Sequence, residues 1–271
     1  MSGSTSLKAL GLKIVAVANQ KGGVGKTTTV ATLASGLARS GEKVLLVDGD
    51  PQGNLSLLFG LEGRHPELGD LFGLLASEGN GEVAKRGSSP RIDACIVKRV
   101  RRSLDILPLS RRHLRTELGD RLIERAEKPF ALALAGLRDR YDWILMDTSP
   151  SNGSLERVLI AASEAVLIPL EFQVFSLSGL EAILADIGEC GDRAGRTIRP
   201  HALLFTKAEN AVARVDAYRN LFASFRIPIF EICKSEYVPR SMERGRTLWE
   251  AAPASLVAKD YRTVIDKAFL G

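Results

Sequence analysis

The stretch Gln20-Lys21-Gly22-Gly23-Val24-Gly25-Lys26-Thr27-Thr28 decides the fold. An apolar run over residues 14–18 leads into it, and a helix-forming run over residues 30–38 leads out. A glycine loop between a strand and a helix is typical of a phosphate-binding loop, because its backbone N–H groups converge on an anion at the helix N-terminus. In this pattern Lys26 reaches the β- and γ-phosphates of a nucleotide, and the Thr27 hydroxyl binds the accompanying magnesium.

The strict motif has a glycine where this chain has Gln20. The other glycines and the Lys-Thr-Thr that follows still favour a phosphate loop over a glycine-rich turn with an incidental lysine.

Length and composition describe an ordinary globular chain. Its 271 residues, 45% of them hydrophobic, suit one large or two small domains. No apolar run approaches the roughly 20 residues that span a bilayer, and the N-terminus lacks the form of a signal peptide, so we expect a cytoplasmic protein. Three scattered cysteines and three scattered histidines argue against disulfides, zinc sites and Cys/His nucleophiles; they are Cys95, Cys190, Cys233, His65, His113 and His201.

The net charge of +5 is unevenly distributed. Thirteen basic and six acidic residues lie between Lys85 and Lys128, and eleven basic and six acidic ones lie between Gly191 and Arg246. Basic blocks on an otherwise balanced chain indicate a polyanionic partner.

Alternating apolar strands and helices predict one α/β domain, a doubly wound, mostly parallel sheet with helices on both faces. The domain spans residues 13–271 and follows an N-terminal tail of residues 1–12. Strands are predicted at 13–19, 44–47, 94–97, 104–108, 143–146, 165–169, 202–205 and 227–232. Helices are predicted at 26–40, 111–127 (capped by Ser110), 129–140 (opened by Pro129), 154–163, 176–189, 211–225 and 255–270. Residues 61–90 are predicted to be an irregular surface excursion, because glycines, serines and a proline interrupt them.

Three carboxylates follow buried strands and so lie at the carboxyl edge of the sheet with the loop. Asp147 is predicted to hold the magnesium shell opposite Thr27. Asp48 and Asp50 are two residues apart in an extended segment, so both carboxylates can face the phosphates. We assign Asp48 to the metal shell and Asp50 to orienting the attacking water.

These motifs resemble the deviant Walker-A ATPases of the ParA/MinD family, and within it the ParA (Soj-like) partition ATPases. The resemblance rests on residues 21–28, on Asp48-Gly49-Asp50-Pro51-Gln52-Gly53-Asn54 and on Tyr141-Asp142-Trp143-Ile144-Leu145-Met146-Asp147-Thr148, with a weaker echo at residues 236–249. It covers about residues 13–265. Two departures are Ser149, where a second proline is usual, and residues 61–90, which match no family pattern.

The resemblance implies a P-loop ATPase that uses ATP and Mg²⁺, forms a homodimer on binding ATP and takes Lys21, Lys26 and Asp50 as catalytic residues. Lys21 is the signature lysine that contacts the partner's phosphates. The nucleotide-binding set is Lys21, Gly22, Gly23, Val24, Gly25, Lys26, Thr27, Thr28 and, near the base, Pro239. The magnesium set is Thr27, Asp48 and Asp147.

The resemblance also implies non-specific binding of double-stranded DNA by the ATP-bound dimer, a nucleoid location and stimulation by a separate adaptor of the ParB kind. Candidate DNA contacts are Arg193, Arg196, Arg199, Arg219, Arg226, Arg244 and Arg246. The short N-terminus argues against the extra helix-turn-helix domain of larger plasmid-type ParA proteins.

Rival functions remain open. A protein assembly can replace the chromosome or plasmid as cargo. A MinD-like membrane ATPase needs a basic amphipathic C-terminal helix, and residues 261–270 carry only two basic residues with Asp266 among them. An iron-protein-like electron donor needs paired cysteines near a switch loop, which the sequence lacks.

Overall fold

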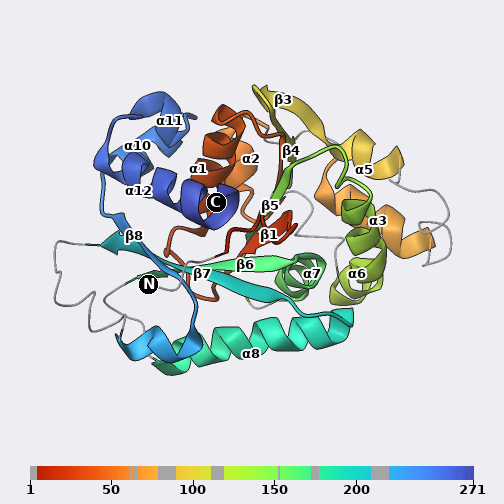
Figure 1. Cartoon of the computed structure of the whole chain (residues 1–271). Helices are drawn as coiled ribbons and strands as arrows, with labels where there is room; N and C mark the ends of the chain where they lie inside the picture. The colour runs from red at the N-terminus through yellow and green to blue at the C-terminus, as the bar shows by residue number, and fades with distance from the viewer. Residues whose placement is uncertain are drawn as a thin grey trace.

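The computed structural model describes residues 5–61, 63, 66–78, 90–110, 119–151, 153–171, 177–208 and 220–271. Eight strands form one sheet in the order β3-β4-β2-β5-β1-β6-β7-β8 (Figure 1). They are β1 (Ile14–Val17), β2 (Val44–Gly49), β3 (Val97–Arg101), β4 (Leu104–Leu107), β5 (Trp143–Thr148), β6 (Ala165–Glu171), β7 (Arg199–Ala208) and β8 (Ile229–Cys233). Every neighbouring pair is parallel except β3 and β4. The predicted fold class is confirmed.

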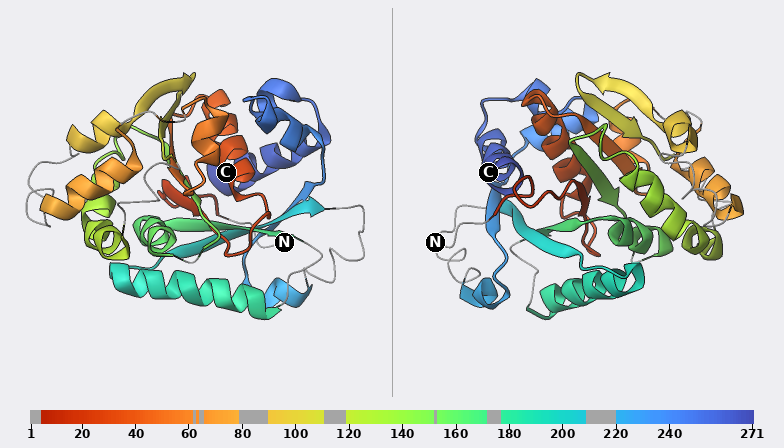
Figure 2. Two further views of the ribbon diagram at one scale, coloured as in Figure 1. Left: turned by 180° about the vertical axis from the view of Figure 1, so that it is seen from behind. Right: turned by 45° about the vertical axis from the view of Figure 1, so that its right-hand side comes forward.

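Helices cover both faces of this sheet (Figure 2). Because side chains alternate along a strand, Ile14 and Ala16 point into one apolar layer, and Val15 and Val17 point into the other. The first layer is completed by α3 (Leu68–Glu78), α5 (Pro90–Cys95), α6 (Asp120–Ala135), α7 (Ser154–Ala162) and α8 (Leu177–Ala194). The second contains α1 (Lys26–Arg39), α2 (Asn54–Leu58), α10 (Tyr237–Glu243), α11 (Leu248–Ala251) and α12 (Leu256–Val264).

The prediction of a surface excursion over residues 61–90 is wrong for the part that the structure describes. Residues 68–78 form α3, whose Leu68, Leu71, Phe72 and Leu75 are fully buried. Their spacing of three and four residues is that of a helix with one buried face. Burial of this stripe against α6 outweighs the helix-weakening glycines, and Phe72 stacks on Phe130 with ring centroids 5.0 Å apart.

Two further boundaries differ from the sequence prediction. Pro129 does not open a helix but lies inside α6, because the buried stripe of Ile123, Ala126, Phe130 and Ala133 continues across it. That burial offsets the roughly 3 kcal/mol by which an interior proline weakens a helix. Residues 94–95 end α5 rather than begin a strand, and β3 starts at 97. The predicted helices over 111–127 and 211–225 lie partly outside the described residues.

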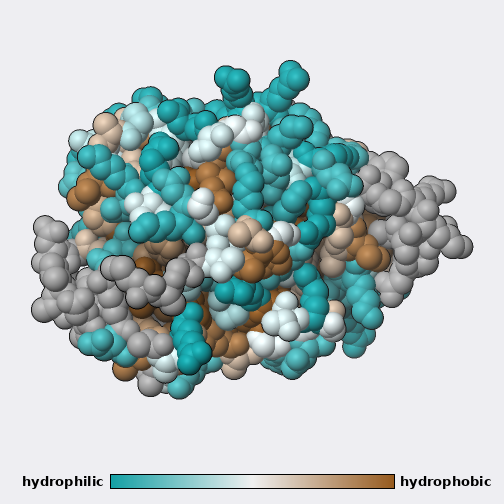
Figure 3. All heavy atoms as spheres, viewed as in Figure 1, coloured by the Kyte–Doolittle hydropathy of each residue, from teal (hydrophilic) through white to brown (hydrophobic). Residues whose placement is uncertain are grey.

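Segments near the two ends of the chain pack together on the α1 face. The N–H of Leu7 donates to the carbonyl of Ala268 at 2.8 Å, and Leu7 is fully buried. After α12 the chain continues as one turn of wider helix, Ile265–Leu270, with Ala268 and Phe269 also buried. Once both layers are filled, hydrophilic residues predominate on the face shown in Figure 3. None of the described helices is long and apolar enough to cross a membrane.

Candidate functional site

The phosphate loop connects β1 to α1 and leaves the start of that helix free for an anion. Gly23 and Gly25 have φ angles of 78° and 86°, in the left-handed region that residues with a side chain rarely adopt. Gly25 is the N-cap of α1, no side chain caps this end, and its first turn holds no acidic residue. The orphan N–H groups and the helix dipole therefore point at an open position with positive potential.

Lys26 lies across the inside of the loop. It is 6% exposed, and its Nζ donates to the carbonyls of Asn19 at 2.8 Å and Lys21 at 3.0 Å. Burial lowers the pKa of Lys26, while Asp147, Glu156 and Asp50 oppose that shift. The ammonium thus faces an acidic site yet is held by neutral carbonyls.

The predicted acids meet at the carboxyl ends of neighbouring strands. Asp48 on β2 is the direct register partner of Asp147 on β5. Asp48 is fully buried and accepts hydrogen bonds from the N–H of Ser56 at 2.7 Å, the hydroxyl of Ser56 at 2.6 Å and the N–H of Asp50 at 3.2 Å. Burial raises the pKa of Asp48 to about 7 despite these bonds.

Asp147 differs from Asp48 and Asp50 because neither of its carboxylate oxygens has a hydrogen-bond partner among the described residues. It is also fully buried. Burial first and the charge of Asp48 second raise the pKa of Asp147 well above its usual range, and the nearby Thr27 hydroxyl offsets this only in part. A buried carboxylate with two free oxygens beside a hydroxyl is a donor set that suits magnesium, a cation that prefers oxygen ligands.

Asp50 is positioned differently from Asp48. It is 8% exposed, and its Oδ1 accepts the N–H of Gln52 at 2.9 Å. Asp50 is among the acids that oppose the lowered pKa of Lys26, and its charge raises the pKa of Asp147 less than that of Asp48 does. The two acids differ in their hydrogen bonds, because the oxygens of Asp48 accept from Ser56 and from the Asp50 backbone. The structure thus gives the two acids of the Asp-Gly-Asp segment separate surroundings.

Lys21 lies at the rim of the site, with 35% of its side chain exposed. Its Nζ is 3.8 Å from Oε2 of Glu171, at the end of β6. Lys207 also approaches Glu171, at 3.2 Å, and donates to the carbonyl of Gly23 at 2.9 Å. Glu171 and Lys207 are not among the predicted site residues, although each lies near the carboxyl end of a buried strand, at the same edge as the predicted acids.

A second hollow adjoins the loop, with a volume of about 570 Å³. Gly23, Gly25, Thr206, Pro239 and Tyr261 are among the residues that line it. Thr206 donates to the carbonyl of Val24 at 2.9 Å, which ties β7 to the loop. Pro239, predicted to lie near a base, is therefore next to the phosphate loop.

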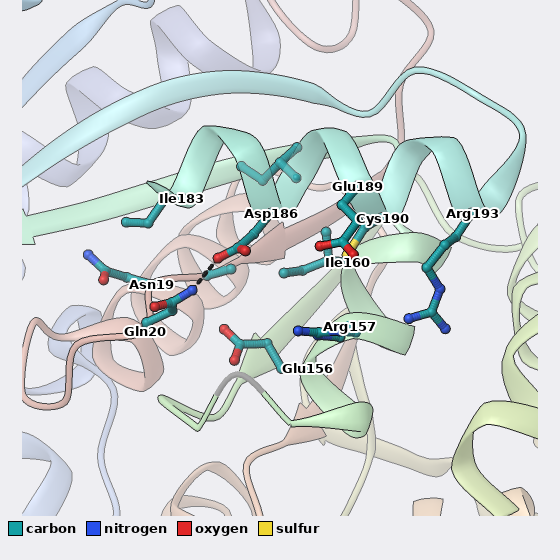
Figure 4. Close-up of a pocket in the computed structure, with 12 residues that line it drawn as sticks. Asn19, Gln20, Glu156, Arg157, Ile160, Ile183, Asp186, Glu189, Cys190 and Arg193 are labelled. Carbon is teal, nitrogen blue, oxygen red and sulfur yellow. Dashed lines mark hydrogen bonds between the residues drawn. The ribbon is translucent and has the colours of Figure 1, made fainter. Parts of the chain in front are cut away.

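Gln20, the residue that departs from the strict motif, connects the loop to α8. Figure 4 shows it reaching Asp186, to which it donates a hydrogen bond, at one end of a small cavity between α7 and α8. Glu156, Cys190 and Arg193 also line this cavity.

The described arginines among those predicted to contact DNA lie on several elements, on both faces of the sheet. Arg193 and Arg196 lie at the end of α8, where Arg193 pairs with Glu127 at 2.5 Å and Arg196 donates to the carbonyl of Ala161 at 2.8 Å. Arg199 begins β7, and Arg226 precedes the neighbouring parallel strand β8. Arg244 and Arg246 lie between α10 and α11, on the other face of the sheet (Figure 1). Arg219 lies outside the described residues.

Comparison with known proteins identifies the family. A family model described as an AAA domain matches residues 12–199. The chromosome-partitioning ATPase Soj of Thermus thermophilus is 30% identical over 262 residues, which cover 93% of this chain and 94% of Soj. The chain belongs to the ParA/MinD family of P-loop ATPases. The chromosome partitioning protein ParA of Caulobacter vibrioides is 37% identical over 65% of this chain and 62% of ParA.

Several solved structures share the fold of this chain. Cyanothece McdA in complex with ATP superposes with a TM-score of 0.75 at 19% identity, covering 94% of this chain and 96% of McdA. MinD of Pyrococcus horikoshii, complexed with Mg-ADP, has a TM-score of 0.67 at 21% identity and covers 92% of each chain. At these identities the likeness extends to the fold alone.

Proposed function

We propose that this protein is a ParA-type ATPase that dimerises on binding ATP, binds DNA without sequence preference and drives the partition of DNA. The observation that carries the proposal is Asp147, a buried carboxylate with two free oxygens beside Thr27 and the uncapped start of α1. A phosphate group at the helix and a magnesium ion at the carboxylate would satisfy both unpaired sets of groups.

Within this proposal each residue has one task. The N–H groups of residues 22–28 and the Lys26 ammonium would hold the phosphates, and Thr27, Asp48 and Asp147 would hold magnesium. Magnesium held there would neutralise charge that develops on the transferred phosphoryl group. Asp50 orients the attacking water, and Pro239 lines the position of the base. Lys21 supplies a second cation to the partner's nucleotide, which makes turnover depend on dimerisation.

DNA binding by the dimer is proposed for the arginines that remain exposed, above all Arg199, Arg226, Arg244 and Arg246. Two copies bring such separated groups together in a way that one chain does not. An adaptor of the ParB kind that stimulates hydrolysis, and a location on the nucleoid, complete the proposal. A protein assembly as cargo would leave all of these residue roles unchanged.

A membrane-positioning function is disfavoured by the packing of the closing helix. Its apolar residues Val264, Ile265, Ala268 and Phe269 are buried against the sheet, so they do not offer the exposed apolar face that an interfacial helix needs.

The experiment is a titration of duplex DNA with and without ATP at two salt concentrations, with Asp50→Ala beside the parent protein. We expect salt-sensitive binding that requires ATP, and an Asp50→Ala protein that binds DNA with ATP but does not turn it over. DNA binding that ignores both nucleotide and salt would remove the partition function, and normal hydrolysis by Asp50→Ala would remove its assignment to the water.

A further inference from the structure

The antiparallel β3–β4 hairpin carries a dense basic cluster at the edge of the sheet opposite the nucleotide site. An open groove of about 750 Å³ runs along it, and a second hollow of about 600 Å³ adjoins the first and shares Arg101, Arg102 and Ser103 with it. We call this surface the hairpin groove and define it by its six cations, Lys43, Lys98, Arg99, Arg101, Arg102 and Arg140. Hydrophilic side chains project from the region of β3 in the space-filling view (Figure 3).

A break in the strand concentrates these cations in one place. In a regular strand Lys98 and Arg99 would point to opposite faces. Here the register shifts between Val97 and Arg101, and Arg99 has a φ of 56° while its N–H donates to Oδ1 of Asp105 at 2.7 Å. The bulge therefore lets consecutive basic residues line the same groove. A left-handed conformation is unfavourable at a residue other than glycine.

Half of the cations in the groove have no carboxylate partner among the residues that the structure describes. Three of the cations have carboxylate partners: Lys98 with Asp105, Arg101 with Glu250 and Arg140 with Asp93. Lys43, Arg99 and Arg102 are exposed, and none forms an ion pair with any residue that the structure describes. The exposed cations are available to an external anion.

The chemistry of the groove favours a polyanion over a protein or a bilayer. Protein interfaces depend on buried apolar anchors, and membrane surfaces need apolar side chains to insert. The large exposed hydrophobic residues of the described chain lie elsewhere; they are Leu10, Leu57, Leu74, Leu132, Leu221, Tyr237 and Leu256. A concave surface lined by arginine and lysine matches the phosphates of a nucleic-acid backbone.

We propose that the hairpin groove binds the phosphate backbone of duplex DNA, as a contact surface separate from the arginines of the C-terminal half. This inference rests on the proposed DNA-binding function and adds a location to it. Lys43 immediately precedes β2 and Arg140 lies just before β5, so the groove is at the amino ends of the strands. The nucleotide site is at their carboxyl ends, and DNA held in the groove leaves that site open.

The test compares Arg99→Asn/Arg102→Ala with Lys259→Ala/Lys267→Ala. This control removes two exposed lysines from the C-terminal helix, neither of which pairs with a carboxylate in the part of the chain that the structure describes. Asparagine is chosen for position 99 because it tolerates a left-handed backbone. Fluorescence anisotropy of a labelled duplex is measured with ATP between 0.05 and 0.2 M salt. ATP hydrolysis without DNA and thermal unfolding confirm that both variants keep the fold.

If two phosphate contacts are lost, the slope of log K against log salt falls by about 1.8 and affinity falls about 30-fold at 0.15 M salt. We expect this loss in the groove variant and not in the control. Equal losses of DNA affinity in the groove variant and the control would refute the proposed groove contact alone. So would a groove variant that binds DNA as tightly as a parent protein that does bind it. A parent protein that does not bind DNA would refute the proposed function and the groove together. A groove variant that loses binding to anionic vesicles but keeps DNA binding would assign the surface to membrane lipid instead.

Discussion

Asp48→Asn is expected to change stability in opposite senses at low and high pH. The carboxyl group of Asp48 has its pKa raised from 3.8 to about 7 by burial. In the ligand-free protein the folded state therefore binds a proton more tightly than the unfolded state does, and stability falls as the pH rises from about 4 to about 7. Raising the pKa by about three units lowers the free energy of unfolding at pH 8 by about 4 kcal/mol relative to its value at low pH. About 3 kcal/mol of this loss falls between pH 5 and pH 8, because the folded protein keeps the proton up to about pH 7.

Asparagine removes this pH-dependent penalty but is a poorer acceptor. The two oxygens of Asp48 accept three hydrogen bonds, and an amide has one acceptor oxygen, so the exchange costs about 1–3 kcal/mol at every pH. Relative to the parent, the variant should gain about 3 kcal/mol of unfolding free energy between pH 5 and pH 8.

The measurement is urea denaturation of both proteins at pH 5, 6, 7 and 8 with EDTA and without nucleotide. Asp142→Asn is the matched control, because this carboxylate lies near the surface and accepts a hydrogen bond from the N–H of Lys43. If Asp142→Asn changed the pH dependence as much as Asp48→Asn does, the effect would not be specific to Asp48. Parallel curves for Asp48→Asn and the parent would refute the reasoning, because Asp48 would then be as easily ionised in the fold as in the unfolded chain.

Three further outcomes are expected. Glu171→Gln releases Lys21 from its 3.8 Å contact. Because such partly exposed pairs contribute under about 1 kcal/mol, the free energy of unfolding should change little, while sedimentation with ATP should show a dimer up to about five-fold tighter. A weaker dimer would contradict this. Gly49→Ala places a Cβ 2.6 Å from the carbonyl oxygen of Asp147 and 2.0 Å from Leu159. Urea denaturation should therefore show a loss of about 1–3 kcal/mol in the free energy of unfolding, and Mg-ATP should bind more weakly. Parent-like values would show that β2 and β5 can move apart without cost. Burial lowers the pKa of His201 below 6.5, so the free energy of unfolding should fall as the pH drops below 6.5. His201→Gln should lessen that fall. If the variant loses stability below pH 6.5 as the parent does, His201 is not the cause.

The sequence could predict the strands and the acids because both follow from burial. Strands covered on both faces are continuous apolar runs, and the carboxylates that follow such runs, Asp48 and Asp147, must lie at one edge of a parallel sheet. Lys207 follows the same rule, and attention to the residues after Phe205 would have found it. Ser56, which holds Asp48, could not be found in this way, because no spacing rule connects a carboxylate to a hydroxyl eight residues later on a separate helix.

Packing explains what the sequence pattern could not. Pro129 is an ordinary helix-opening signal, and only the continuation of a buried stripe on both sides of it places it inside α6. The bulge at Arg99 has no local signal at all, because arginine is not a residue that favours a positive φ. The basic block was visible as composition, but its convergence into one groove depends on that backbone conformation.

A cation and phosphates bound together would satisfy both the unpaired oxygens of Asp147 and the uncapped start of α1. The charge of Lys26 acts on Asp147, yet its ammonium donates to the carbonyls of Asn19 and Lys21 and forms no ion pair with Asp147 among the described residues. A direct Lys26–Asp147 pair would neutralise the acid and remove the affinity for a metal ion. A metal ion alone would satisfy Asp147 but leave the N–H groups of α1 unpaired, and phosphates alone would bring further negative charge to a buried carboxylate. The arrangement therefore favours the cation and the phosphates as one unit, which is the form in which a magnesium nucleotide arrives.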